Sequence, residues 1–235
     1  MKKSTIFTLL TVFVLIPLTL WMGLRLPGRW FYLTSTLIVI YTMVPFFLAF
    51  ESRRPQAREL VVIAVLCALA VASRAAFIMV PHFKPMTAII MISAIAFGPQ
   101  TGFLVGAVSA FASNFIFGQG PWTPWQMMAY GMGGLLAGVV YRKGWLPRKP
   151  LWLAFFGLFA VALVVGPLLD CCTVFTSLTS FTWASVLFVF GQGVPVNLVH
   201  GACTFLTLLL FSKPLLEKLE RIQVKYGMMV DDHGL

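Results

Sequence analysis

Residues 97–130, FGPQTGFLVGAVSAFASNFIFGQGPWTPWQMMAY, combine a membrane-type packing pattern with a polar corner. A Gly-Pro turn opens the stretch, and Gly102, Gly106 and Ala110 then recur at every fourth position of an apolar run. Small residues at this interval allow another helix backbone to approach closely in lipid. The run ends at Asn114 and a Gly-Gln-Gly-Pro corner with two tryptophans behind it, and polar amides beside aromatic rings are typical of small-molecule sites. The stretch therefore predicts a packed membrane helix that leads into a binding corner.

The composition of the 235-residue chain places it in the membrane class. Hydrophobic residues make up 60% of the sequence and charged residues 10%, against roughly 25% charged residues in soluble domains, and the mean hydropathy is +0.93. Lipid offers no partner to backbone amides, so each apolar run is expected to be helical. The runs are residues 5–24, 30–50, 60–80, 86–97, 102–117, 125–141, 151–169 and 181–211. The sequence predicts an all-α fold, a polytopic membrane helical bundle.

Four of these runs differ from a plain membrane span. Residues 5–24 follow two lysines, as in a signal peptide, but the run is too long and lacks a cleavage pattern, so we interpret it as a retained signal-anchor helix. Residues 86–97 and 102–117 are shorter than the ~20 residues of a span and predict either thin, tilted helices or a re-entrant hairpin. Residues 181–211 are too long for one straight span, and Pro195 is expected to bend them.

A shift in composition near residue 55 divides the chain. Residues 1–56 are expected to form two accessory transmembrane helices and a basic linker, because Gly and Ala become frequent only from Glu59 onward and mark tightly packed helices. Residues 57–215 are expected to form a six-segment core. Residues 216–235 are expected to be a cytoplasmic tail that is partly an amphipathic helix on the inner surface.

The basic residues predict the orientation of the helices. If both termini are cytoplasmic, most of the 17 Lys and Arg residues lie in inner segments, as the positive-inside rule requires. The net charge of +10 then reflects membrane orientation rather than nucleic-acid binding. We therefore expect a multi-pass protein of the plasma membrane whose external segments are the 118–125 corner, the 81–85 loop and the loop after Asp170.

Motifs for an energy source or for catalysis are missing from the sequence. There is no GxxxxGK[ST] stretch to hold ATP phosphates, and neither HExxH nor GxSxG occurs. Asp170 is the only carboxylate of the apolar core, and we place it at an external helix end rather than at mid-membrane, where coupled carriers keep acidic residues. The four cysteines lack metal-ligand spacing, and His200 is expected to be a hydrogen-bonded core residue. We expect no enzyme activity, metal or cofactor of the chain's own, so another chain must supply energy for uphill transport.

Ala64, Ala68 and Ala72 recur at every fourth position of the 60–80 run. Small residues at this spacing pack against a neighbouring helix in lipid. The pattern fits two arrangements equally well: packing inside the same bundle, or a flat face on which a separate subunit docks.

Together, the alanine stripe, the FGPQTGFLVG turn, the external GQGPWTPWQ corner and the basic RKGWLPRK loop resemble the S-components of energy-coupling factor (ECF) transporters, most closely the cobalamin-specific type. The resemblance covers residues 57–215 and implies a subunit that binds a vitamin at its outer face. It also implies docking on a transmembrane coupling subunit through Ala64, Ala68 and Ala72, toppling in the membrane, and two ATPase partners that use ATP. The two accessory helices depart from the six-helix pattern. The alternatives are an S-component for riboflavin, folate, pantothenate or a similar vitamin, and an autonomous membrane carrier.

The candidate substrate-binding residues are polar or aromatic and lie in or beside the predicted external segments. An amide in lipid must find a partner, which favours Asn114 and Gln126, whereas any single Trp or Tyr here is equally compatible with an interfacial anchor. His82, Phe83 and Lys84 would close over a ligand. The full set is Arg74, His82, Phe83, Lys84, Asn114, Gln119, Trp122, Trp125, Gln126, Tyr130, Asp170 and Gln192.

For the charged and amide residues near the outer boundary, the sequence is compatible with either a structural role or contact with the substrate. For Arg74 and Asp170 we expect a structural ion pair, and the alternative is contact with amide or phosphate groups of the substrate. Gln192 and Asn197 lie beside Pro195 and would either line the floor of the pocket or bond backbone groups freed at the proline. A corrinoid is large and rich in amides, so it would suit an open, shallow outer cavity.

Overall fold

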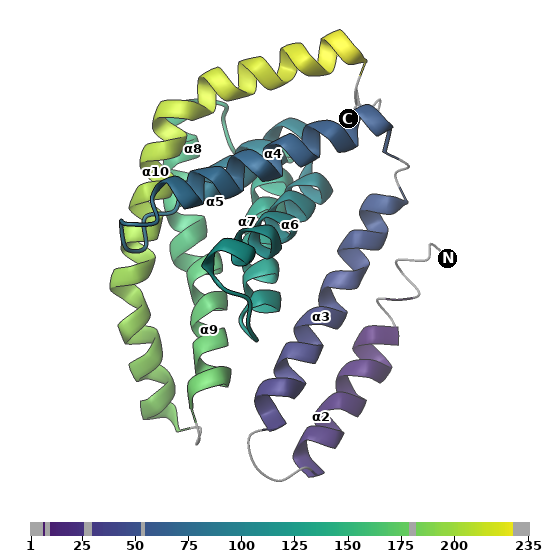
Figure 1. Ribbon diagram of the computed structural model, residues 1–235, viewed down its shortest axis with the longest axis vertical. Coiled ribbons are helices and arrows are strands. Elements are labelled where there is room, and N and C mark those ends of the chain that lie inside the picture. The colour runs from purple at the N-terminus through teal and green to yellow at the C-terminus, as the bar shows by residue number, and fades with distance from the viewer. Residues whose placement is uncertain (1–6, 8–9, 26–29, 53–54, 179–181, 228–235) are drawn as a thin grey trace.

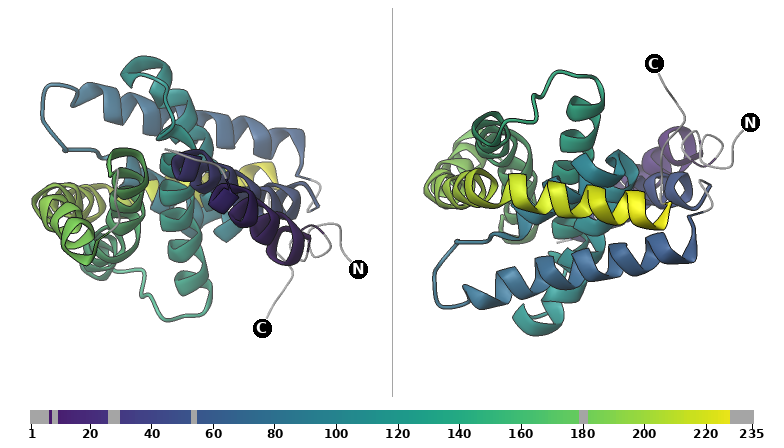
Figure 2. Two further views of the ribbon diagram at one scale, coloured as in Figure 1. Left: turned by 90° about the horizontal axis from the view of Figure 1, so that it is seen from below. Right: turned by 90° about the horizontal axis from the view of Figure 1, so that it is seen from above.

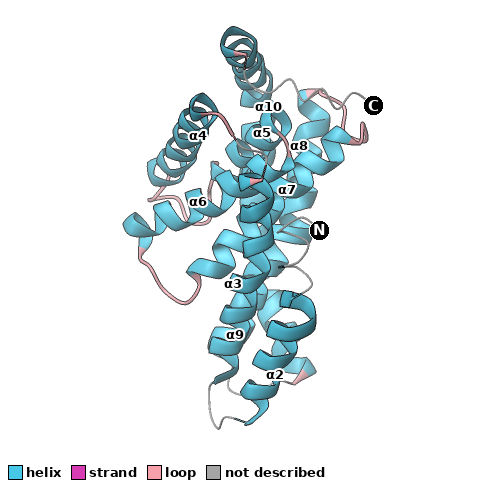
Figure 3. Cartoon of the chain, turned by 90° about the vertical axis from the view of Figure 1, so that its right-hand side faces the viewer, coloured by secondary structure: helices cyan, strands magenta, loops and turns pink. Residues whose placement is uncertain are grey.

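The computed structural model describes residues 7, 10–25, 30–52, 55–178 and 182–227, and these form helices joined by loops, without a strand (Figure 3). The all-α prediction is confirmed. In chain order the elements are the π-helical turn η1 (Thr11–Leu15), α2 (Ile16–Arg25), α3 (Trp30–Glu51), α4 (Ala57–Ala76), α5 (Met86–Phe97), α6 (Pro99–Phe117), α7 (Thr123–Arg142), α8 (Pro150–Ala160), the π-helical turn η2 (Val161–Val165), α9 (Gly166–Ser177) and α10 (Trp183–Tyr226).

Five stretches of the described chain are long and apolar enough to span a membrane. They are Leu33–Glu51 of α3, α4, α6, the continuous Pro150–Ser177 stretch of α8 to α9, and α10. The prediction of a polytopic membrane bundle is thereby confirmed. Helix α6 begins at Pro99 rather than at the predicted Gly102, because proline is favoured in the first turn of a helix.

Helix α5 forms the centre of the core. All of its 12 residues are buried except Ala96, which is half-buried, and it packs against α4, α6, α7 and α10 (Figure 1). Its apolar character on every side reflects contact with protein on every side. Gly98 connects α5 to α6 with a φ of 95°, a conformation that residues with a side chain rarely adopt, so the two helices form a tight hairpin.

The small-residue stripe of α6 faces α7. A Cβ atom at Gly106 would lie 2.5 Å from the carbonyl oxygen of Tyr130, and Gly102 meets the backbone of Gly134 in the same way. Ala110 is fully buried. The expected close approach of a second helix backbone is confirmed, and α7 is the helix that makes it.

The alanine stripe of α4 points away from the bundle. Ala64, Ala68 and Ala72 lie on the exposed side of the helix, whereas Leu66 and Ala70 between them are buried against the core. Packing inside the same bundle, one of the two interpretations of this stripe, is therefore wrong. Docking of a separate subunit stays a prediction.

Helices α2 and α3 form a pair beside the core, and α3 packs against α6, α7 and α9 (Figures 1 and 3). The ring of Phe46 stacks on that of Phe103 of α6, with 4.3 Å between the ring centroids. Val39 and Met43 of α3 are buried in the same apolar cluster. The predicted accessory segment is therefore held against the core by side-chain packing.

Helix α10 runs for 44 residues and contains both Pro195 and Pro214. Its yellow C-terminal part changes direction and crosses the bundle (Figures 1 and 2). Pro214 falls in this part and lacks the N–H that would continue the helical hydrogen bonding. Leu216 and Leu219 are buried beneath this part of the helix, so the predicted amphipathic helix is a continuation of α10.

Candidate substrate-binding site

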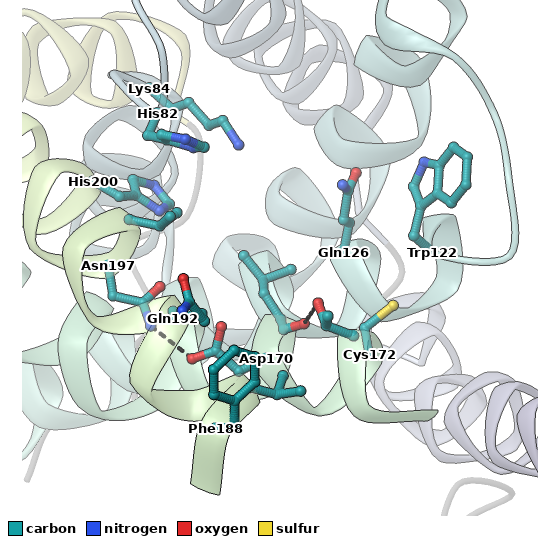
Figure 4. Close-up of a pocket in the computed structure, with 15 residues that line it drawn as sticks. His82, Lys84, Trp122, Gln126, Asp170, Cys172, Phe188, Gln192, Asn197 and His200 are labelled. Carbon is teal, nitrogen blue, oxygen red and sulfur yellow. Dashed lines mark hydrogen bonds between the residues drawn. The ribbon is translucent and has the colours of Figure 1, made fainter. Parts of the chain in front are cut away.

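A cavity of about 480 Å³ lies between the α4–α5 loop, the start of α7, and helices α9 and α10 (Figure 4). The loop supplies His82 and Lys84, and the start of α7 supplies Trp122 and Gln126. A cavity of this size is typical of small-molecule sites. Helices α9 and α10 complete the wall with Leu169, Asp170, Cys172, Thr173, Phe188, Val189, Gln192, Gly193, Val196, Asn197 and His200.

A second cavity of about 300 Å³ lies beside the first. The two share His82, Lys84, Trp122 and Gln126, so these four residues mark the place where the cavities meet. The second cavity extends toward the ends of α4 and α6. Its remaining lining residues are Arg74, Phe77, Ile78, Val80, Pro81, Phe83, Asn114 and Phe117.

Asn114 is buried and joins the corner between α6 and α7. Its side-chain oxygen accepts a hydrogen bond from Arg74 Nη1 at 3.1 Å, and its side-chain nitrogen donates to Thr123 Oγ1 at 3.1 Å and to Gln126 Oε1 at 2.9 Å. Both N–H donors of the Asn114 amide are thus engaged within the protein. Gln126 uses only its oxygen in this network, so its N–H donors are available to a ligand in either cavity.

Arg74 and Asp170 do not form the expected ion pair. Besides its hydrogen bond to Asn114, Arg74 donates a hydrogen bond to Ser113 Oγ. Its guanidinium carbon lies over the ring of Phe117, 4.2 Å from the ring centroid. Asp170 instead accepts a hydrogen bond from Asn197 Nδ2 at 2.8 Å (Figure 4). The prediction is wrong because each side chain meets a polar group on the neighbouring helix: Arg74 of α4 reaches α6, and Asp170 of α9 reaches α10.

His200 lies beside the first cavity and is only 2% exposed. Its Nε2 atom shares a hydrogen bond of 2.7 Å with Thr87 Oγ1 of α5. The ring of Tyr130 packs edge-on against it at a centroid distance of 5.9 Å. The prediction of a hydrogen-bonded core histidine is confirmed, and the same residue also contributes to the cavity wall.

Residues 55–217 match the model of a family described as "ECF-type riboflavin transporter, S component". The chain belongs to this S-component family. The match includes every residue that lines the two cavities and leaves α2, α3 and the end of α10 outside. The predicted resemblance to ECF S-components is therefore confirmed. The match does not show the cobalamin-specific type, which stays a prediction.

A curated protein is also similar to part of this S-component. A UPF0397 protein of Vibrio atlanticus (strain LGP32) is 31% identical over 85 residues, which is 35% of this chain. The aligned part covers 46% of that relative's length, so the chain spans about half of it. No solved structure matches the chain.

The structure of the S-component gathers nine of the twelve predicted site residues around the two cavities. They come from α4, the α4–α5 loop, α6, the start of α7, α9 and α10, and their contact with substrate stays a prediction. The nine are Arg74, His82, Phe83, Lys84, Asn114, Trp122, Gln126, Asp170 and Gln192.

Three predicted site residues lie outside both cavities. Gln119 is exposed, and its oxygen accepts a hydrogen bond from Thr123 Oγ1 at 2.8 Å. Trp125 is buried and stacks on Phe175 of α9, with 5.6 Å between ring centroids. Tyr130 is fully buried on α7, and its hydroxyl has no hydrogen-bond partner in the described part of the chain.

In the first cavity, α10 holds most of the lining residues that the sequence analysis did not select. Phe188 and Val196 stand four residues to either side of Gln192, and His200 follows four residues later. Residues at this spacing share one helix face. Extending that face from Gln192 would have found them, and Thr173, three residues after Asp170 on α9, would have been found in the same way.

Proposed function

We propose that this S-component captures a vitamin at the outer face of the plasma membrane and delivers it by docking on a transmembrane coupling subunit and toppling against it. The observation that carries this proposal is the presence, on one small bundle, of a polar and aromatic cavity and an exposed alanine stripe. The sequence has no ATP-binding motif. Two ATPase subunits attached to the coupling subunit would therefore supply the energy.

The exposed face of α4 is the proposed docking surface. Val61 and Val65 lie 64% and 61% exposed beside the alanine stripe, and Leu60 and Leu69 are exposed as well, so the surface is apolar and combines small with larger aliphatic side chains. Such a face lets a helix of the coupling subunit approach to backbone distance. The same helix carries Arg74 at its other end, where it lines the second cavity, so docking and substrate binding share one rigid element.

The basic residues at the far ends of α5, α6 and α7 support an inner face there. Arg142 packs over Gly98, and Arg148 donates a hydrogen bond to Glu220, which raises the pKa of the Arg148 guanidinium above its usual value. The cavities lie at the opposite ends of the same helices. With positive residues inside, both termini are cytoplasmic and both cavities open outside.

Cavity size favours a flavin-type vitamin as the substrate. A volume of about 480 Å³ lies in the range that holds drug-sized ligands. Trp122 and Phe188 offer aromatic surface to a ring system, and Gln126, Gln192 and Asp170 offer hydrogen bonds to hydroxyl and carbonyl groups. The family description points to the same vitamin. Cobalamin is bulkier and would have to fill the second cavity as well, which makes it the second candidate.

Co-purification tests the assembly. Tagged full-length protein, extracted from its own membrane in mild detergent, is expected to bring along a membrane coupling subunit and two ATPases. Recovery of the single chain alone would contradict the proposal, as would uptake of a vitamin by liposomes that contain only this purified chain.

Quenching of tryptophan fluorescence tests the substrate. Trp122 lines both cavities, so a bound flavin or corrinoid should quench it. Trp122→Phe should lose most of the quenching, whereas Trp145→Phe, in the loop beyond the opposite end of α7, should keep it. Quenching that survives in Trp122→Phe would place the ligand elsewhere.

A further inference from the structure

The charges that line the two cavities are unevenly distributed. Lys84 lines both cavities, and Arg74 lines the second. Asp170 is the only carboxylate among the described residues of either lining, and it is hydrogen-bonded to Asn197. Figure 4 shows Asp170 across the first cavity from His82 and Lys84. The junction of the cavities is therefore positively charged.

Arg74 holds its charge in a buried position. The residue is 6% exposed, and its contacts are the neutral side chains of Ser113, Asn114 and Phe117. Its Nε atom is buried and finds no hydrogen-bond partner within the described chain. A cation inside a membrane protein is expensive unless an opposite charge compensates it. An anion in the second cavity would provide that compensation.

Lys84 supplies a second cation at the same place. Its side chain extends from the α4–α5 loop into the first cavity (Figure 4), and its ammonium group makes no hydrogen bond or ion pair with another described residue. His82 lines both cavities beside it and offers a further ring nitrogen. An ammonium group and a guanidinium group are the usual partners of phosphate and carboxylate oxygens.

We propose that the captured vitamin carries a phosphate group that binds between Arg74 and Lys84 where the two cavities meet. This inference rests on the proposed function, in which the cavities hold a vitamin. The body of the ligand occupies the first cavity, with its ring system beside Trp122 and Phe188 and its hydrogen-bonding groups toward Asp170. A neutral ligand would leave both cations without a counter-charge.

A site for a phosphate group would discriminate between phosphate-bearing and phosphate-free forms of the same vitamin. A flavin is expected to bind as its 5′-phosphate in preference to riboflavin, which is neutral. A corrinoid is expected to bind with its phosphodiester-linked nucleotide, as in cobalamin, in preference to cobinamide, which lacks that group.

Calorimetric titration of the purified full-length protein in lipid nanodiscs tests the inference with two pairs of compounds: flavin mononucleotide and riboflavin, and cobalamin and cobinamide. In at least one pair the phosphate-bearing compound should bind about tenfold more tightly or better, the gain expected of a charge-assisted hydrogen bond. Lys84→Gln should remove most of this preference, because it weakens binding of the phosphate-bearing compound more than binding of the phosphate-free one. Lys143→Gln, beyond the other end of α7, is the matched control and should keep the preference.

Three outcomes would overturn the inference. Equal affinities within both pairs, or a preference that Lys84→Gln leaves intact, would do so while the proposed function stands. Failure of all four compounds to bind would also overturn it. Co-purification of the coupling and ATPase subunits then decides separately whether the proposed function holds.

Discussion

Two helices of this S-component carry small residues at every fourth position, and the two stripes lie in opposite environments. On α6, the stripe from Gly102 to Ala110 is buried against the backbone of α7. On α4, the stripe from Ala64 to Ala72 is exposed. The spacing of small residues shows that another helix can approach closely, but it does not say which helix does so. In the structure, α7 of the same chain packs on the stripe of α6, whereas the stripe of α4 is left uncovered.

The buried stripe also leads to the site. One turn beyond Ala110 on the same face stands Asn114, which binds Arg74 from the buried face of α4 and Gln126 from α7. The close contact between α6 and α7 thus ends at the hydrogen-bond network of Arg74, Asn114 and Gln126, which lines the second cavity.

The largest effect is expected when the buried stripe is filled. In Gly106→Leu the new side chain would meet the Tyr130 backbone, which cannot move aside, so the free energy of unfolding should fall by about 3 kcal/mol or more. Size-exclusion profiles and thermal unfolding measure this. Gly191→Ala is the control, because no atom lies within 4 Å of the added Cβ, and a Gly106→Leu protein as stable as the wild type would contradict the packing described here.

Filling the exposed stripe should have an effect on transport alone. Ala68→Trp is expected to fold, to bind ligand and to change the free energy of unfolding by less than about 0.5 kcal/mol, yet to abolish uptake in cells that hold the coupling and ATPase subunits. Leu163→Trp, at an apolar position that is 72% exposed on η2, is the matched control and should transport. Normal uptake by Ala68→Trp would rule out docking through α4.

Removal of the polar group at the end of the buried stripe should have an intermediate effect. Asn114→Ala leaves Arg74 and Gln126 without their shared partner, so the free energy of unfolding should fall by about 1–3 kcal/mol. Ligand affinity should fall as well, measured by tryptophan quenching. Gln56→Ala removes an exposed amide that makes no capping hydrogen bond at the start of α4 and should do neither; equal losses in the two variants would contradict the role of Asn114.

The smallest effect concerns the contact between the accessory pair and the core. Phe46→Ala removes one ring stack with Phe103 and should lower the free energy of unfolding by about 1 kcal/mol, with uptake retained. Thermal unfolding in detergent measures the change against Phe159→Ala, whose ring is at a position that is 57% exposed. No difference between the two variants would mean that α3 contributes nothing to the stability of the core.

Much of the fold follows from apolar runs, because lipid enforces helices wherever a run is long enough. The bounds of α5 at Met86 and Phe97 are those of the predicted run, since Pro85 and Gly98 flank it. What the runs could not give is the rotation of each helix about its axis. A lipid-facing side is as apolar as a buried one, so the two small-residue stripes looked alike until the helices were placed.

For the candidate site, too, the sequence indicated the residues but not how the helices place them. Chemistry and external position selected Gln126, Lys84 and Asp170 from segments far apart in sequence, and the structure brings them around one cavity. The partner of Asp170 could not be predicted, because Asn197 and Arg74 are both polar residues near the outer boundary and only the placement of α9 against α10 decides between them.

The enclosure of α5 has a consequence for hydrophobic mismatch. Twelve residues of α-helix are about 18 Å long, far short of the ~30 Å hydrocarbon layer. A helix this short in contact with acyl chains would thin the bilayer around it or draw polar headgroups inward. Because four other helices surround α5, its length is hidden from lipid, and the match to bilayer thickness is set by the longer segments outside it.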